Sequence, residues 1–188
     1  GGSAYGWNGW ECFSASVMIL PQIEQMPLYT QFAQAPAGGF GAFYNGPMKT
    51  QLNVFLCPST NKFPNPGFGW GGPGSHYGWC SGSSVHTAWN AWDQQNGMFN
   101  VGVERKMADV TDGLSNTIMA SEFLSGDAND GTATYPYDIF YVGDGPFNSI
   151  ANKAWPTAAE LNTIGQAAQT SPSGQRSNNG SLWAWYAH

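Results

Sequence analysis

A loop over residues 126–138 holds the side chains best suited to chemistry, and that chemistry is cation binding. Carboxylate and amide oxygens are the ligands that Ca²⁺ prefers in proteins. The loop departs from the helix–loop–helix calcium pattern, because Gly131 stands at the fifth position, where that pattern needs an acceptor. Asp and Asn are also common simply as turn formers. Calcium is the one cofactor that the sequence offers, and its candidate ligands are Asp127, Asn129, Asp130 and Asp138.

The remaining reactive residues do not form the pattern of an active site. The three histidines lack a paired spacing and no Cys-x-x-Cys accompanies them, so a zinc site is not expected. Cys80 and His86 could act as nucleophile and base, but a structural Cys and a surface His are the preferred interpretation. The sequence contains no phosphate loop, dinucleotide fingerprint or Gly-x-Ser-x-Gly motif. We therefore expect no enzymatic activity.

Three cysteines allow one disulfide and one spare thiol, or three buried thiols. A bridge between Cys57 and Cys80 would close a loop of about 24 residues and stabilise the fold by about 3 kcal/mol in the chain-entropy model. Cys12 would then be the odd cysteine. Bridges from Cys12 to either of the others remain open alternatives.

Aromatic residues are abundant, with 9 Trp, 8 Tyr and 11 Phe. Exposed Trp and Tyr rings can stack on sugar rings, and Trp7, Trp10 and Trp70 are the candidates for such a platform. The competing interpretation is that these rings pack onto the core, and it is preferred for Trp7 and Trp10 because Trp is highly buried on average.

The elements that must position these residues centre on the stretch Glu104–Glu122. Asp112 and Gly113 indicate a turn, because Gly adopts positive φ without strain. Asp109 is expected to cap a tight helical turn. The residues that follow, 117–119, have a composition typical of a strand, and we expect that strand to lie inside the sheet.

Periodicity and turn signals predict the other elements. Pro21 and Pro27 divide one helical stretch, because proline is favoured in a first turn and disfavoured in a helix interior. Thr157 and Glu160 form a capping box, and Gly165 is expected to end that helix. The expected helices span residues 21–26, 27–33 and 157–165. The expected strands span residues 52–56, 97–99, 139–142 and 181–186. The expected loops span residues 35–47, 61–77, 126–138 and 171–180.

Composition limits the class of protein. The 188 residues suit a single domain over residues 1–188, with a loop insertion at about residues 61–92. Only 10% of the residues are charged, the net charge is −6, and the six basic residues are scattered, which argues against nucleic-acid binding. Low charge with many Gly and aromatic residues suits an extracellular or cell-surface protein. No run of 18 apolar residues occurs.

Three stretches resemble, in order, the signature of a large pseudopilin-like family that is abundant in planctomycetes. They are Val17–Phe32 (VMILPQIEQMPLYTQF), Val54–Ser59 (VFLCPS) and Ala108–Glu122 (ADVTDGLSNTIMASE). Members of that family carry a prepilin-type N-terminal cleavage and methylation helix, which these residues do not include, and a C-terminal domain of unknown function.

The resemblance implies an α+β fold, with short helices on an antiparallel, pilin-like sheet and long loops rich in Gly and aromatic residues. It also implies a structural subunit of an extracellular pilus-like filament or surface assembly, which self-associates and meets a membrane only through the N-terminal helix. Head-to-tail contacts that do not close generate such filaments. The alternative is a secreted carbohydrate-binding module that uses exposed Trp and Tyr.

Overall fold

The computed structural model describes residues 13–34, 40–65, 72–85, 95–100, 103–142, 145–170 and 174–185. Short helices and antiparallel strands occur together in these ranges, so the fold class is α+β, as the sequence predicts. The α-helices are α1 (Ala15–Met18), α2 (Met26–Ala33), α3 (Phe40–Asn45), α4 (Gly145–Asn148) and α5 (Ala158–Thr170). The strands are β1 (Tyr77–Trp79), β2 (Ala120–Glu122), β3 (Ile139–Tyr141) and β4 (Gly174–Arg176). Short 3₁₀ helices span Leu20–Ile23, Pro47–Lys49, Asn53–Phe55, Met107–Asp109 and Leu114–Asn116.

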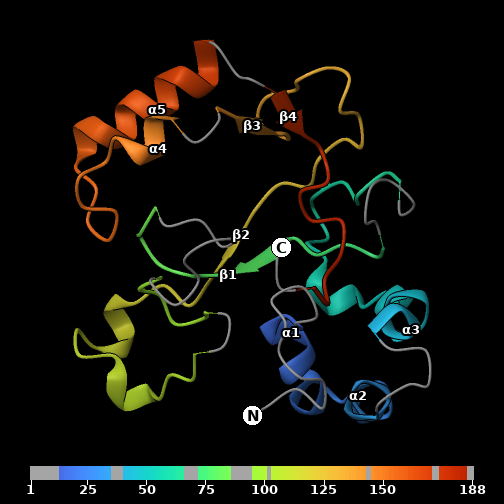
Figure 1. Ribbon diagram of the computed structural model, residues 1–188. Coiled ribbons are helices and arrows are strands. Elements are labelled where there is room, and N and C mark those ends of the chain that lie inside the picture. Colours follow the sequence, from blue (N-terminus) through green and yellow to red (C-terminus); the bar gives the residue numbers. More distant parts are fainter. Residues whose placement is uncertain are drawn as a thin grey trace.

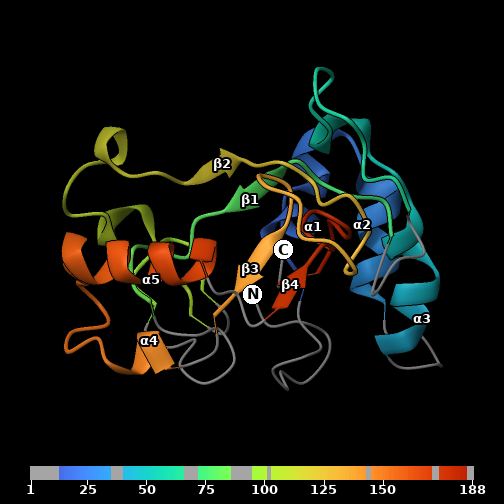
Figure 2. The same cartoon turned by 90° about the horizontal axis from the view of Figure 1, so that it is seen from above.

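Two groups of helices lie at opposite ends of the molecule, with the β1–β2 pair between them (Figures 1 and 2). Helices α1, α2 and α3 gather at one end, and α4 and α5 pack together at the other. Strand β1 pairs antiparallel with β2, and β3 pairs antiparallel with β4. Strand β3 confirms the strand expected at residues 139–142. Of the helices in the described ranges, none is long and apolar enough to cross a membrane.

The first helical region follows the proline pattern of the sequence. Pro21 stands in the first turn of the 3₁₀ helix Leu20–Ile23, and Pro27 stands in the first turn of α2. Between them Glu24 adopts a left-handed conformation with φ of 62°, which separates the two pieces. The predicted division into two helical pieces is confirmed, although the first piece ends at Ile23 and is preceded by α1.

The core is built around a buried segment, residues 180–185, which we call the central segment. Its backbone forms hydrogen bonds with residues 72–75. Gly72 N–H donates to the Ser181 carbonyl at 2.8 Å, and Ser75 N–H donates to the Gly180 carbonyl at 3.1 Å. In the other direction, Trp183 N–H donates to the Pro73 carbonyl at 3.2 Å. Because these bonds are irregularly spaced, no regular strand forms here beyond an isolated bridge of Trp185. The prediction of a strand at residues 181–186 is therefore wrong.

Trp183 is the centre of the aromatic core and is only 1% exposed. Its indole stacks on Phe55, with ring centroids 5.6 Å apart, and meets Phe32 edge-on at 5.9 Å. The indole N–H donates to the Thr50 carbonyl at 2.9 Å, so the polar atom of this buried ring is satisfied. The central segment thereby joins helix α2 to the turn that contains Phe55.

Four predictions of local structure are wrong, and tertiary contacts explain the clearest one. Residues 53–55 form a 3₁₀ helix in place of the strand expected at 52–56, because Phe55 turns inward onto Trp183 and its carbonyl accepts from His76 N–H at 2.8 Å. Helix α3 forms within the expected loop 35–47, and β4 within the expected loop 171–180. Gly97 and Met98 form a bend, and residues 97–99 form no strand.

Helix α5 confirms the capping box. Thr157 N–H donates to Glu160 at 2.8 Å, and Glu160 N–H donates to the Thr157 hydroxyl at 3.2 Å. The hydrogen bonds that the Thr157 N–H and hydroxyl donate to the Glu160 carboxylate hold the pKa of Glu160 below its usual value. The predicted end at Gly165 is wrong, because the helix continues to Thr170 through Ala and Gln residues that favour helix.

Candidate functional site

The residues predicted to bind calcium lie in one loop, but their carboxylates accept hydrogen bonds from the protein. Asp127 accepts from the Ser177 hydroxyl at 2.8 Å, and Asp130 accepts from the Ser177 N–H at 2.8 Å. Asp138 accepts from the Thr134 N–H at 2.7 Å. In the ranges that the structure describes, no three His, Cys, Asp or Glu side chains converge as metal ligands. Calcium binding by Asp127, Asn129, Asp130 and Asp138 stays a prediction.

These carboxylates instead tie the loop to the chain that enters the central segment. Ser177, which donates two of these hydrogen bonds, is fully buried. Two further bonds run beside it: Gly126 N–H donates to the Asn179 carbonyl at 3.0 Å, and the Asn179 side-chain amide donates to the Leu124 carbonyl at 2.6 Å. Both backbone and side-chain hydrogen bonds therefore hold the loop against this part of the chain.

The pKa of Asp127 is lowered from its usual value, first by the hydrogen bond from Ser177 and then by that from Thr134. A carboxyl with a lower pKa in the folded than in the unfolded protein stabilises the fold above the unfolded pKa, and that stabilisation is lost as the pH falls through the folded pKa. The difference in melting temperature between the native protein and Asp127→Asn should therefore be largest at neutral pH and shrink below about pH 4. Thermal unfolding followed by circular dichroism across this range measures it.

Ser177→Ala provides the matched comparison for Asp127→Asn. This variant removes the hydroxyl that lowers the pKa of Asp127, so it should reduce the same pH-dependent difference. A gap between native protein and Asp127→Asn that stays constant from neutral to acidic pH would contradict the assignment.

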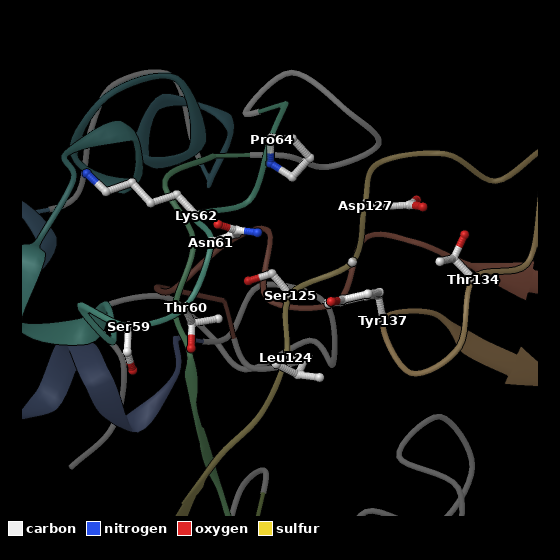
Figure 3. Close-up of a pocket in the computed structure, with 11 residues that line it drawn as sticks. Ser59, Thr60, Asn61, Lys62, Pro64, Leu124, Ser125, Asp127, Thr134 and Tyr137 are labelled. Atoms are coloured by element: carbon white, nitrogen blue, oxygen red, sulfur yellow. The ribbon is translucent and has the colours of Figure 1, made fainter.

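A cavity of about 710 Å³ lies beside this loop (Figure 3). One wall is the segment that follows the Asn53–Phe55 turn, and the other is the chain after β2. The lining residues are Ser59, Thr60, Asn61, Lys62, Pro64, Leu124, Ser125, Gly126, Asp127, Thr134 and Tyr137. Most carry a hydroxyl or amide group, and Lys62 and Asp127 are the two charged residues of this lining. Sequence reasoning missed the cavity, because its two walls are some 60 residues apart in the chain.

His76 is the other group that the sequence did not single out. It is fully buried, and its Nδ1 accepts the Cys57 N–H at 2.8 Å. The proton of a neutral ring then sits on Nε2, which is buried without a hydrogen-bond partner. His76 also bonds Phe55 and Phe123 through its backbone, so it connects the turn, β1 and the chain after β2. His86 and His188 lie outside the described residues.

Cys57 and Cys80 are both free, so the predicted bridge between them is not formed. The backbone of Cys57 bonds the His76 side chain, whereas Cys80 follows the end of β1 and bonds the Met119 carbonyl. The three residues of β1 separate His76 from Cys80, so the Cα atoms of these two residues lie about 13 Å apart along an extended chain. Cys12 lies outside the described residues.

A turn at residues 110–113 is present, with a φ of 91° at Gly113, but the buried strand predicted after it is not. The prediction that Asp109 caps a helical turn over 109–113 is wrong: Asp109 is the last residue of the 3₁₀ helix Met107–Asp109, and its carboxylate accepts the Lys106 N–H at 2.7 Å. Residues 117–119 precede β2, and Ile118 and Met119 are 68% and 52% exposed. The local alternation favours a strand, but no described element covers these two side chains. The predicted aromatic platform of Trp7, Trp10 and Trp70 lies outside the described residues.

Comparison with known proteins identifies the family of this chain. The family described as "Protein of unknown function (DUF1559)" matches residues 1–186. No curated protein and no solved structure matches the chain. Because the family match spans almost the whole sequence, the chain belongs to the DUF1559 family.

Proposed function

We propose that this protein is a structural subunit of an extracellular, pilus-like filament or cell-surface assembly. We also propose that this protein is a pseudopilin-like member of its family. This proposal is supported by the three ordered stretches at residues 17–32, 54–59 and 108–122, which resemble the pseudopilin-like signature. The role needs contact surfaces and no catalytic group.

The observation that carries the proposal is an exposed apolar edge at residues 118–124, which we call the β2 edge. Ile118, Met119 and Leu124 are exposed there, and every residue of β2 is exposed as well. Among the described residues, β2 has β1 as its one strand neighbour. An open strand edge can pair with another chain, and in β2 its one protecting charge is Glu122 at the end of the strand.

Burial of this edge against a neighbouring subunit supplies a driving force for assembly. Fully burying one large aliphatic side chain stabilises association by roughly 1.5–3 kcal/mol, before the costs of ordering are subtracted. Two such side chains are therefore worth at least about one factor of ten in affinity. A contact between the β2 edge and a different face of the next copy is heterologous, and it extends into a filament when its rotation does not close a ring.

The test compares self-association of the native, full-length protein with that of Ile118→Asp and Met119→Asp. Sedimentation over a range of concentrations, with negative-stain imaging, should show assembly that each substitution weakens roughly tenfold or more. Leu161→Asp is the matched control, because Leu161 is an exposed aliphatic residue on α5, away from the β2 edge. Native protein that stays monomeric at every concentration would refute the proposal, and so would variants that assemble normally.

The alternative role, a secreted carbohydrate-binding module that uses Trp7, Trp10 and Trp70, depends on residues outside the described ranges. No described contact of those three rings favours it over assembly.

A further inference from the structure

We propose that the cavity between residues 59–64 and 124–137, which combines apolar surface with hydroxyl and amide groups, binds an uncharged saccharide unit. This inference uses neither the β2 edge nor the predicted Trp platform, so it stands apart from the assembly proposal. The volume of about 710 Å³ falls within the range of small-molecule sites, roughly 300–1,000 Å³. It is large enough for one or two sugar rings.

The arrangement of charge in the cavity favours an uncharged ligand. Figure 3 shows the Lys62 side chain directed away to one side and the Asp127 carboxylate turned toward Thr134 on the other. The Asp127 carboxylate is already occupied by the Ser177 hydroxyl, at 2.8 Å, and by the Asn129 N–H, at 3.0 Å. An anionic ligand would meet this carboxylate without a guanidinium or a second ammonium among the lining residues to compensate.

The middle of the cavity offers the groups that recognise a polyhydroxylated ring. Asn61, Ser125 and Tyr137 lie between the two charged walls (Figure 3). An amide provides both donors and an acceptor, and each hydroxyl can donate and accept, which matches the mixed character of sugar hydroxyls. Tyr137 is 39% exposed, so part of its ring is open to a ligand. Its electron-rich face suits the polarised C–H groups of a pyranose.

Ser125 is the buried polar residue of the cavity wall. The residue is only 6% exposed, and among the described residues its hydroxyl oxygen has no hydrogen-bond partner. A buried, unpaired hydroxyl is unfavourable, and native proteins usually satisfy such groups. The oxygen packs toward Gly180, so a bound sugar hydroxyl would reach it only after a movement of this wall.

The test is calorimetric titration of the full-length protein with glucose, galactose, mannose, N-acetylglucosamine and the charged sugar glucuronate. We expect saturable binding of at least one uncharged sugar and weaker binding of glucuronate than of glucose. Tyr137→Ala and Asn61→Ala should each weaken binding roughly tenfold, because each removes one contact to the ring. Both side chains lie outside the buried core, and Asn61→Ala keeps the test decisive if Tyr137→Ala does not fold.

Trp155→Ala is the matched control, because Trp155 is 70% exposed and is not part of the cavity lining. Its sugar binding should equal that of the native protein. Repeating the titration with an oligosaccharide of the preferred sugar distinguishes a glycan chain, which should bind more tightly, from a free monosaccharide. Absence of saturable binding by every uncharged sugar would overturn the inference, as would binding lost in Trp155→Ala but retained in Tyr137→Ala and Asn61→Ala. Neither result would bear on self-association through the β2 edge.

Discussion

Trp183→Ala is expected to lower the free energy of unfolding by about 3–5 kcal/mol, as measured for large aromatic residues in protein cores. The indole is 1% exposed and contacts the Phe55 and Phe32 rings, so its removal leaves a cavity that the surrounding backbone cannot easily fill. The Thr50 carbonyl also loses its donor. Because domains are usually stable by only about 5–15 kcal/mol, this loss is a large fraction of the total.

Urea unfolding of the native protein and the variant, followed by far-ultraviolet circular dichroism, measures this loss. Trp155→Ala removes the same atoms from an exposed position and should change the stability by no more than about 0.5 kcal/mol. Trp183→Phe should fall between the two, because it keeps a ring in the core but leaves the Thr50 carbonyl without its donor. Equal stabilities for Trp183→Ala and Trp155→Ala would mean that the central segment does not hold the core together.

Gly180→Ala is expected to destabilise the protein by about 2–4 kcal/mol, for two reasons that add. Gly180 has a φ of 70°, a conformation that an alanine adopts only with strain. A Cβ at this position would also lie 2.7 Å from the Ser75 carbonyl oxygen and 2.9 Å from the Phe123 ring. The Ser75 contact is with backbone that bonds the Gly180 carbonyl, so relief of the overlap would weaken that pairing.

Gly165→Ala is the control for Gly180→Ala, and it should have the opposite sign. Gly165 lies inside α5, and a Cβ there would meet nothing within 4 Å. Alanine favours helix over glycine by about 0.5–1 kcal/mol, so this variant should melt at a higher temperature than the native protein. If both substitutions shifted the melting temperature in the same direction, the close packing around Gly180 would be wrong.

Local signals predicted several elements correctly, because the interactions behind them span only a few residues. Pro21 and Pro27 set the starts of two helical pieces, and Thr157 with Glu160 sets the start of α5. Gly113 adopts the positive φ that its turn requires. In each case the deciding contact lies within one turn of the chain, so it can be read from a short window of sequence.

The contacts of the candidate-site residues could not be predicted from the sequence, because a residue type does not reveal which distant residue it will bind. The oxygen-rich loop was recognised, but its carboxylates bind Ser177, which lies about 50 residues further along the chain. The cavity and the buried His76 gave no local signal. His76 matters because folding brings the Cys57 N–H to its ring, and nothing near it in sequence indicates that contact.

The sequence by itself determined the fold class, the proline-started helices, the capped start of α5 and the turn at Gly113. Tertiary structure alone decided that residues 53–55 form a 3₁₀ helix, that Ile118 and Met119 face solvent and that residues 180–185 form the centre of the core. The reason is the separation of the partners. Hydrogen bonds between residues 72–75 and the central segment join parts of the chain more than 100 residues apart, and they override the strand preference of residues 181–185.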